Sequence, residues 1–294
     1  MLQYLFLKQN RANSFSLFLR HVRKNILLVS LLLLTSCSSS IYPHFSGIGR
    51  VKEYAIYSAD LPASFDSFRV AFIADLHYKS KFKKKQLISC VSALKLIRPD
   101  ALLLGGDYQE GCAYVEELFR YLSQVNPTYG VYGVLGNNDY ERCTDSIRRV
   151  MKRYNMQLLE HKVATIVKGR DSIFVCGIRD PFNLKKNGIS PTLSLSPQDF
   201  VILLTHTPDY AEQVDISNSD LVLAGHTHGG QIRFLKWIVP HTGSVYKKRF
   251  LTGKAMTDQG IPVITTNGLG TSRIKFRFGS PSEIVVVTLH KKDN

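Results

Sequence analysis

Apolar residues occur along the chain in two alternating patterns. Short uninterrupted runs predict strands buried on both faces, and runs in which apolar residues recur every three or four positions predict amphipathic helices. Pro99 ends the first of these helices because a residue before proline avoids helical backbone. In the first half, the runs predict strands over 69–75, 101–107 and 130–139, with helices over 85–98 and around 115–122.

The second half of the chain is richer in strands. We expect a hairpin over 164–178, turning at Gly169, and a polar loop over 181–198. Further strands are predicted over 200–208, 220–228, 262–268 and 283–289. Strands that alternate with helices form strand–helix–strand units and a parallel sheet. The pattern predicts one α/β domain over 68–290, built on two sheets, preceded by a linker and lead-in over 38–67.

Residues 1–37 have the character of an export signal. RHVRKN (20–25) is basic, ILLVSLLLL (26–34) is apolar, and Leu34-Thr35-Ser36-Cys37 resembles the end of a bacterial lipoprotein signal. Cys37 would then carry the lipid, and an uncleaved membrane anchor is the alternative. Either form predicts a protein associated with a bacterial membrane, with the inner membrane favoured and the sidedness open.

Composition adds an electrostatic prediction. The chain has 294 residues, 44% of them hydrophobic, and its 38 Lys and Arg against 23 Asp and Glu give a net charge of +15. This excess predicts an anionic partner or a solvated basic surface. Cys90, Cys112, Cys143 and Cys176 match no zinc or redox spacing, so we expect buried free thiols, which favour a reducing compartment.

Polar side chains gather where the predicted strands end. Carboxyl ends of parallel strands face a common crevice, so these residues can converge although they are distant in sequence. Carboxylate, amide and imidazole ligands suit first-row transition metals, and so many candidates predict two ions that activate water and clamp a phosphoryl group. The candidates are Asp75, His77, Asp107, Asn137, Asp139, His206, His226 and His228.

Five blocks of sequence then identify a resemblance. ADLH (74–77), GGD (105–107), GNND (136–139), THTPD (205–209) and GHTHGGQ (225–231) resemble the calcineurin-like metallophosphoesterases. GHTHGGQIR with TNGLGTS (266–272) resembles a bacterial membrane-associated branch that includes hydrolases of phospholipid-like substrates and a UDP-2,3-diacylglucosamine hydrolase of lipid A synthesis. GDYQEG (106–111) lacks the pattern of the serine/threonine protein phosphatases.

The resemblance implies a fold and a ligand set. The fold is a two-sheet sandwich flanked by helices. Two divalent ions are implied, with manganese favoured over iron, zinc or nickel, and Asp107 would bridge them. The first ion would be held by Asp75, His77, Asp107 and His228, and the second by Asp107, Asn137, His206 and His226.

One position departs from the family. Asn138 stands where the family has a histidine that contacts the phosphate or protonates the leaving oxygen. Asparagine can donate a hydrogen bond but no proton near neutral pH. Loss of a general acid matters least for a phosphate leaving group, so we hypothesise that the scissile bond is a pyrophosphate. Asn138 and Asp139 are the expected catalytic residues, and Asp139, as a neighbour of His206, is expected to act by orienting a ligand.

Basic and apolar residues flank the motifs. Lys79, Lys81 and Lys83 follow the first block, and 273–278 alternates in the manner of an edge strand. Together with 232–239, this segment suits contact with acidic headgroups or acyl chains, although core packing explains its apolar residues equally well. Arg233 and Arg273 are the further candidates for substrate or membrane contact, whereas no nucleic-acid motif is present.

These observations predict a metal-dependent phosphoesterase acting on a lipid-linked or nucleotide-linked phosphate. UDP-2,3-diacylglucosamine is the favoured substrate, which would yield UMP and a lipid-linked sugar 1-phosphate. A general phospholipid or polar phosphodiesterase or phosphatase is the alternative within enzymes. A non-catalytic metal-binding scaffold is the alternative of another class.

Overall fold

The computed structural model describes residues 42–43, 45–234 and 238–292, and His44–Asn294 form one compact unit. The expected export signal and Cys37 lie outside the described residues. Within the described part of the chain, no helix is both long and apolar enough to cross a membrane.

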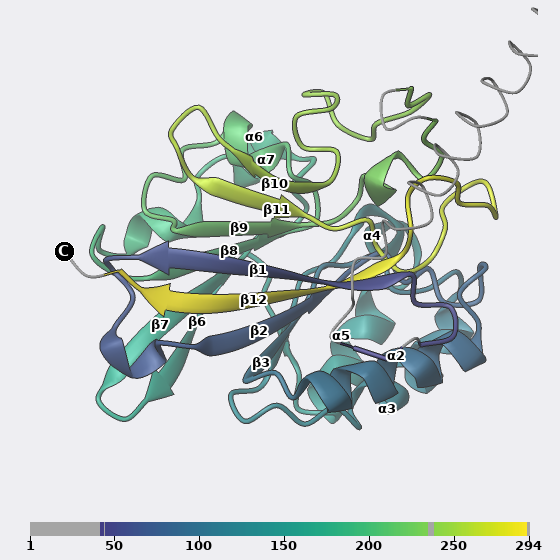
Figure 1. The fold of residues 1–294 in the computed structure, drawn as a ribbon, viewed down its shortest axis with the longest axis horizontal. Helices are drawn as coiled ribbons and strands as arrows, with labels where there is room; N and C mark the ends of the chain where they lie inside the picture. Colours follow the sequence, from purple (N-terminus) through teal and green to yellow (C-terminus); the bar gives the residue numbers. More distant parts are fainter. Residues whose placement is uncertain (1–41, 44, 235–237, 293–294) are drawn as a thin grey trace, which may run out of the picture. The chain divides into compact units, whose positions relative to one another are not determined.

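Two six-stranded sheets form the framework (Figure 1). The first sheet runs in the order β1 (Arg50–Ser58), β12 (Glu283–Lys291), β2 (Phe68–Ile73), β3 (Ala101–Leu104), β4 (Val131–Gly133) and β5 (Gln157–Leu158). The second runs in the order β10 (Gly253–Met256), β11 (Pro262–Thr265), β9 (Leu221–Ala224), β8 (Val201–Thr205), β7 (Asp171–Gly177) and β6 (Lys162–Lys168).

Short helices connect and cover these strands. α2 and α3 belong to the crossovers that follow β2 and β3, and α5 packs against α3. The α-helices are α2 (Lys84–Ile97), α3 (Val115–Leu122), α4 (Asn137–Arg142), α5 (Thr144–Arg153), α6 (Leu184–Asn187) and α7 (Tyr210–Gln213). The 3₁₀ turns are η1 (Ala63–Phe65), η2 (Cys112–Tyr114), η3 (Pro191–Ser194) and η4 (His228–Gly230).

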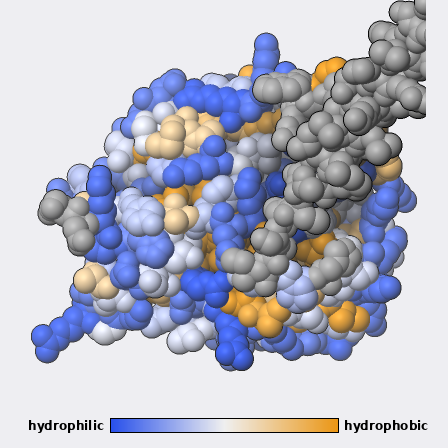
Figure 2. Space-filling view, viewed as in Figure 1, coloured by the Kyte–Doolittle hydropathy of each residue, from blue (hydrophilic) through white to orange (hydrophobic). Residues whose placement is uncertain are grey.

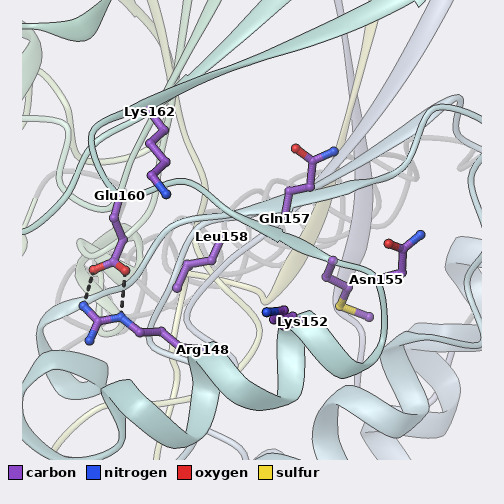
Figure 3. Close-up of a pocket in the computed structure, with 8 residues that line it drawn as sticks. Arg148, Lys152, Asn155, Gln157, Leu158, Glu160 and Lys162 are labelled. Atoms are coloured by element: carbon purple, nitrogen blue, oxygen red, sulfur yellow. Dashed lines mark hydrogen bonds and ion pairs between the residues drawn. The ribbon is translucent and has the colours of Figure 1, made fainter.

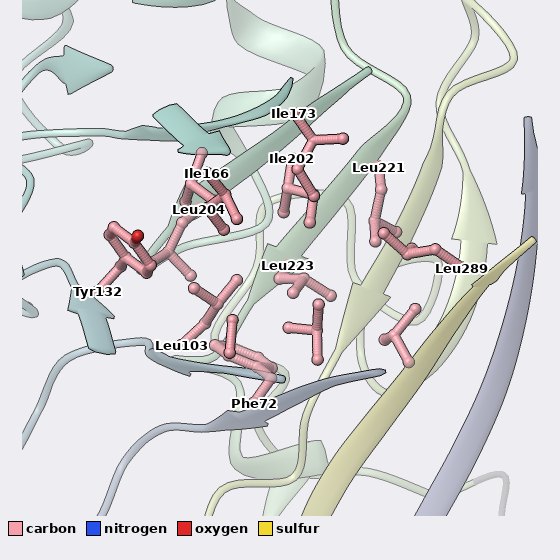
Figure 4. Packing of buried hydrophobic residues seen from close by; sticks show 14 of the residues in the cluster. Phe72, Leu103, Tyr132, Ile166, Ile173, Ile202, Leu204, Leu221, Leu223 and Leu289 are labelled. Atoms are coloured by element: carbon pink, nitrogen blue, oxygen red, sulfur yellow. The ribbon is translucent and has the colours of Figure 1, made fainter. Parts of the chain in front are cut away.

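The core lies between the two sheets. Ile202, Leu204 and Leu223 of the second sheet pack toward Phe72 and Leu103 of the first (Figure 4). Alternate residues of the same strands, including Leu203 and Val222, point outward into a second apolar cluster that contains Tyr210 of α7. Because these strands are buried on both faces, their sequences are continuous apolar runs. The expected two-sheet sandwich flanked by helices, in one domain, is confirmed.

The sheets are mixed, which corrects the expectation of a parallel sheet. β2 to β5 are parallel neighbours, but β12 pairs antiparallel with β2 and parallel with β1. β1 lies in the segment assigned to the lead-in, so the folded sheet includes residues well before 68. The strand expected over 130–139 ends at Gly133, since α4 begins at Asn137.

Two local expectations were wrong. Residues 273–278 form an irregular loop instead of an edge strand, with a single bridge from Phe278 to Ile232. Arg277 turns inward and donates to backbone carbonyls, so the basic side chains of this segment do not share one exposed face as the expected strand required. Cys112 and Cys143 form a disulfide, whereas Cys90 and Cys176 are buried free thiols.

Candidate metal centre

The candidate ligands follow five different strands of the two sheets. Asp75 and His77 follow β2, Asp107 follows β3, and Asn137 begins α4 beyond β4. His206 directly follows β8, and His226 and His228 follow β9. These strands end at the side of the molecule where α4 and the yellow loop after β11 lie (Figure 1). Side chains from both sheets therefore reach one place.

Asp107 lies at the centre of the ligand cluster. Its Oδ2 is 3.5 Å from Nε2 of His77 and 3.5 Å from Nε2 of His206. Oδ1 of Asp75 is 3.6 Å from Nε2 of His228. Two overlapping groups have ligand atoms within 4.8 Å of one another: Asp75, His77 and His228, and Asp75, Asp107 and His206.

His226 and Asn137 extend the second group. Nδ1 of His226 lies 3.3 Å from Nε2 of His206, so the two imidazoles bring ring nitrogens close together. Oδ1 of Asn137 is buried without a hydrogen-bond partner, which is costly for an amide oxygen unless a ligand binds it. The donor set therefore fits two divalent cations of the first transition row.

Neighbouring groups orient the imidazoles. Nδ1 of His206 donates to the Gly105 carbonyl oxygen at 2.7 Å. The lone pair of Nε2 is therefore the one that can bind a metal ion. Nδ1 of His77 donates to Oε1 of Glu110 at 2.7 Å, so its Nε2, which lies 3.2 Å from Nε2 of His228, points toward the other ligand candidates. A hydrogen bond at the outer nitrogen fixes the tautomer and the ring orientation of a metal-ligating histidine.

The ligands sit on strained backbone. Asp75, His77, Asp107, His226 and His228 all have φ between 41° and 67°, in the left-handed region. Such a conformation costs a non-glycine residue about 1–2 kcal/mol, and strain of this kind is typical of functional sites. Each strand thus turns sharply at its end, which points the ligand side chain into the shared crevice.

Glycines make room for the carboxylates. A Cβ on Gly136 would lie 2.1 Å from Oδ1 of Asp107, and a Cβ on Gly225 would lie 2.5 Å from Oδ2 of Asp75. No larger residue fits either place without moving a ligand. The glycines of GNND and GHTH therefore serve close packing against Asp107 and Asp75.

The buried charges perturb one another. Burial disfavours the ionised form of Asp107, but the adjacent imidazoles outweigh it and hold the pKa of Asp107 well below its usual range. Burial also disfavours the charged form of His206 and would lower its pKa. The carboxylates of Asp107 and Asp75 outweigh burial and raise that pKa to about 9. Burial and then the charge of His206 lower the pKa of His226 to about 3. These opposed shifts are typical of a functional site.

Asp139 lies behind the ligands. Its carboxylate accepts from the backbone N–H of Asp107 at 2.7 Å, of Tyr108 at 3.1 Å and of Gly136 at 2.9 Å. The side chain is fully buried and does not line the pocket, so Asp139 cannot act on a substrate directly. Its hydrogen bond to the Asp107 N–H holds the backbone of that ligand candidate in place, which is consistent with a residue that orients a ligand.

Asn138 lines a pocket of about 580 Å³ beside the ligands, together with His226, His228 and Glu110. Nδ2 of Asn138 is 3.1 Å from Nδ1 of His77, and the Asn138 N–H donates to Oδ1 of Asp107 at 2.9 Å. The amide therefore lies in the pocket directly beside the ligand cluster. This volume suits a small-molecule substrate.

The basic candidates divide into two groups. Arg273 lines the pocket, but Lys79, Lys81, Lys83 and Arg233 do not. Lys79 pairs with Glu117 at 2.9 Å and Lys83 donates to the Lys79 carbonyl, so both stabilise the loop. Lys81 reaches outward over the ring of Phe276.

Sequence reasoning missed several residues that build the pocket. Glu110 could have been found from its place three residues after Asp107. Gln231, Arg142 and His241 also line the pocket; Gln231 stands in the quoted GHTHGGQ block, whereas no motif singles out Arg142 or His241. Arg277 was read as one face of a strand, whereas it binds the carbonyls of Asn267, Gly270 and Ser280.

A second pocket lies elsewhere and shares no residue with the ligand cluster. It has a volume of about 420 Å³ and is lined by Arg148, Lys152 and Glu160 among others (Figure 3). Both oxygens of Glu160 accept from the Arg148 guanidinium. This pairing neutralises the most prominent charge of the pocket, so we assign no ligand to it.

Comparisons with known proteins agree with the site. The family model of the calcineurin-like phosphoesterases matches residues 68–230. Phosphodiesterase YaeI of Escherichia coli is 30% identical over 218 residues, covering 69% of this chain and 76% of the relative. The uncharacterized metallophosphoesterase Cj0846 of Campylobacter jejuni is 26% identical, covering 98% of this chain and 75% of the relative.

The uncharacterized metallophosphoesterase YkuE of Bacillus subtilis is 27% identical and covers 81% of this chain and 84% of the relative. Among solved structures, the NAD nucleotidase NadN of Haemophilus influenzae aligns with a TM-score of 0.48 and 15% identity. That alignment covers 69% of this chain and 45% of the nucleotidase.

Proposed function

Because this chain belongs to the calcineurin-like phosphoesterase family, we propose that it hydrolyses a pyrophosphate bond in a lipid-linked nucleotide, with UDP-2,3-diacylglucosamine as the favoured substrate. The chain is a metal-dependent phosphoesterase, and the family and the ligand cluster indicate two divalent ions. We propose manganese for both positions. Bound there, the ions would supply Lewis acidity and lower the pKa of a water molecule.

The proposal that the scissile bond is a pyrophosphate rests on Asn138. Its amide faces the pocket and can hydrogen-bond a phosphate oxygen, but it cannot protonate a departing oxygen. An alkoxide leaves poorly without a proton, whereas a phosphate leaves readily because its second pKa is about 6. A pyrophosphate bond therefore suits this pocket better than an alkyl ester does.

An apolar lip beside the pocket supports a lipid-linked substrate. We define the lip as Phe234, Ile238, Ile274, Phe276 and Phe278, whose side chains are all about half exposed. The rings of Phe234 and Phe278 contact each other in a tilted arrangement with their centroids 5.1 Å apart, and Ile274 also lines the pocket. Lys81 lies over Phe276 at 5.8 Å, and Arg273 adjoins Ile274, so cations border the lip.

Hydrophilic residues predominate on the face drawn in Figure 2, where apolar residues form small separate patches. Aromatic side chains bordered by cations are typical of contact with an anionic lipid surface. We therefore propose that the lip contacts the membrane or the acyl chains.

The disulfide favours the alternative substrate, a phospholipid phosphodiester. Disulfides persist in oxidising compartments, so the Cys112–Cys143 bond supports an exported domain on the outer side of the inner membrane. An exported domain on that face would meet the phospholipid headgroups of the membrane. The expectation of free thiols, which favoured a reducing compartment, no longer stands for this pair.

Product analysis tests the proposal. We expect the Mn²⁺-loaded protein to release UMP from UDP-2,3-diacylglucosamine in detergent micelles and to cleave an alkyl phosphodiester such as glycerophosphocholine at least tenfold more slowly. Asp107→Asn should lose metal and activity together, whereas Asp60→Asn, at an exposed carboxylate, should retain both. A preference for the alkyl ester would refute the pyrophosphate assignment and leave the phosphoesterase.

Vesicle flotation tests the lip. We expect the protein without residues 1–37 to bind vesicles of phosphatidylglycerol more tightly than vesicles of phosphatidylcholine. The double variant Phe276→Ser, Phe278→Ser should lose this binding, while the double variant Ile88→Ser, Leu96→Ser, at exposed apolar residues of α2, should not. Equal binding by both variants would exclude the lip as the contact surface.

A further inference from the structure

Two arginines at the rim of the pocket belong to neither the ligand cluster nor the apolar lip. Arg142 ends α4, and Arg273 lies in the loop after β11, yet both line the pocket that contains Asn138 and His228. Among the residues that the structure describes, neither guanidinium forms an ion pair with a carboxylate. Both side chains are exposed to the pocket and to solvent.

The loop that carries Arg273 is fixed to the metal-ligand turn. Gln231, in the GHTHGGQ block, accepts from the Ser272 N–H at 2.9 Å and donates to the carbonyls of Ser272 at 3.1 Å and Ile274 at 2.7 Å. Arg273 lies between the two residues held by this amide. Its φ of 56° is left-handed, so the clamp maintains a backbone conformation that an arginine rarely adopts.

Arg277 anchors the same loop at its other end. Its guanidinium donates to the carbonyls of Asn267 at 2.7 Å and His228 at 3.2 Å, and its Nε donates to Gly270 at 2.8 Å. The guanidinium of Arg277 therefore hydrogen-bonds to backbone carbonyls, and these bonds hold the loop in position relative to His228. Arg273 is left as the cation that this loop presents to the pocket.

Arg142 is fixed from the opposite element. It precedes Cys143, whose disulfide to Cys112 joins the end of α4 to the segment that follows Glu110. The rim thus holds a cation on each of two rigid supports. The lining also contains two carboxylates: Glu110 is engaged by His77, and Glu141 adjoins Arg142.

We propose that Arg142 and Arg273 form a second-phosphate subsite, which binds the phosphate group adjoining the one that the metal centre attacks. The inference rests on the proposed function, since only a diphosphate substrate has such a group. Arginine suits the task because its planar guanidinium donates two parallel hydrogen bonds to phosphate oxygens. The subsite would select diphosphates over simple phosphodiesters and would also hold the leaving phosphate.

Competition between two nucleotides tests the subsite. UMP offers one phosphate, whereas α,β-methylene-UDP offers two and cannot be hydrolysed at the bridge. With the Mn²⁺-loaded protein, isothermal titration calorimetry gives the ratio of their dissociation constants, in which the contribution of the metal centre largely cancels. We expect the wild type to bind α,β-methylene-UDP at least tenfold more tightly than UMP.

Variants then assign the preference to the arginines. Arg273→Gln and Arg142→Gln should each reduce the ratio about tenfold, and Arg273→Lys should restore part of it because it keeps the charge. Lys275→Gln is the matched control, since Lys275 is exposed on the same loop but does not line the pocket. Circular dichroism and metal content should be equal in all four variants.

The outcomes separate this inference from the proposed function. A wild-type ratio near one, or a ratio unchanged in both arginine variants, would overturn the subsite. Equal losses in Lys275→Gln and Arg273→Gln would also overturn it, because they would indicate a general charge effect. If the ratio behaves as expected but UDP-2,3-diacylglucosamine is not cleaved, the subsite stands and the proposed substrate is wrong.

Discussion

Asn138 shows how a single side chain can define the chemistry of a pocket. Its backbone N–H donates to Oδ1 of Asp107, which holds the residue beside the carboxylate at the centre of the ligand cluster. Its side chain can polarise a phosphate oxygen but has no proton to give. Under the proposed function, the leaving group therefore departs as an anion.

Restoring the family histidine should widen the substrate range. We expect Asn138→His to raise kcat for an alkyl phosphodiester by at least tenfold, because general acid catalysis contributes a factor of about 100–10,000. Turnover of a pyrophosphate should change less than threefold. Steady-state kinetics on both substrates, with metal content measured for each protein, would check this.

Two controls limit the interpretation. Asn138→Asp keeps the size of the side chain, and its carboxylate is ionised at neutral pH, so it should not raise the alkyl ester rate. If Asn138→His brings no gain, a proton already reaches the leaving oxygen. His241, which also lines the pocket, would then be the group to replace next.

Residue identities were the most predictable part of the site. Each ligand candidate could be named because polar residues interrupt apolar runs at strand ends. The left-handed backbone at these residues and the clamps made by Gln231 and Arg277 could not be named. The contacts of Gln231 and Arg277 depend on the path of the 270–280 loop, which reaches the GHTH turn only in the folded protein.

At the scale of elements, the Cys112–Cys143 disulfide joins two segments that carry site residues. Cys112 begins η2, two residues after Glu110, and Cys143 lies between α4 and α5. The bond spans 31 residues, a separation at which a crosslink restricts the unfolded chain considerably. The stability of the site region should therefore depend on oxidation.

Loss of the disulfide should destabilise the fold. We expect Cys112→Ser, Cys143→Ser to lower the free energy of unfolding by about 2–4 kcal/mol, measured by urea denaturation under oxidising conditions. A reductant should lower the wild-type value by a similar amount and leave the double variant unchanged. If the reductant changes both proteins equally, the effect does not arise from this bond.

The sequence predicted the alternating units but not the arrangement of every strand. β2, β3 and β4 follow from apolar runs separated by helices. β1 was overlooked because its residues alternate between exposed and half-buried positions, as an edge strand does. The antiparallel placement of β12 beside β2 joins the two ends of the domain, and no local pattern records such a pairing.

At the scale of the whole molecule, Asp220 joins the two sheets. Its carboxylate accepts from Ser58 Oγ at 2.7 Å, at the end of β1, and from the Val201 N–H at 2.8 Å, at the start of β8. Burial raises the pKa of Asp220 to about 6, and these hydrogen bonds offset only part of that effect. The folded state therefore binds this proton more tightly than the unfolded state does.

This difference predicts a pH dependence of stability with a definite sign. A raised pKa in the folded state favours folding most below the unfolded pKa of 3.8, and the benefit disappears as the pH rises through about 6. Between these values, Asp220 should reduce the free energy of unfolding by up to about 1.4 kcal/mol per pH unit. Asp220→Asn, which cannot ionise, should lack this contribution. The difference in free energy of unfolding between this variant and the wild type should therefore change across pH 4–6 and be constant above pH 7.

Asp60→Asn, at a nearby exposed carboxylate that contributes weakly to the Asp220 pKa, should follow the wild type closely. A difference that stays constant from pH 4 to pH 8 would show that Asp220 ionises equally in both states, and the junction between the sheets would then be insensitive to pH.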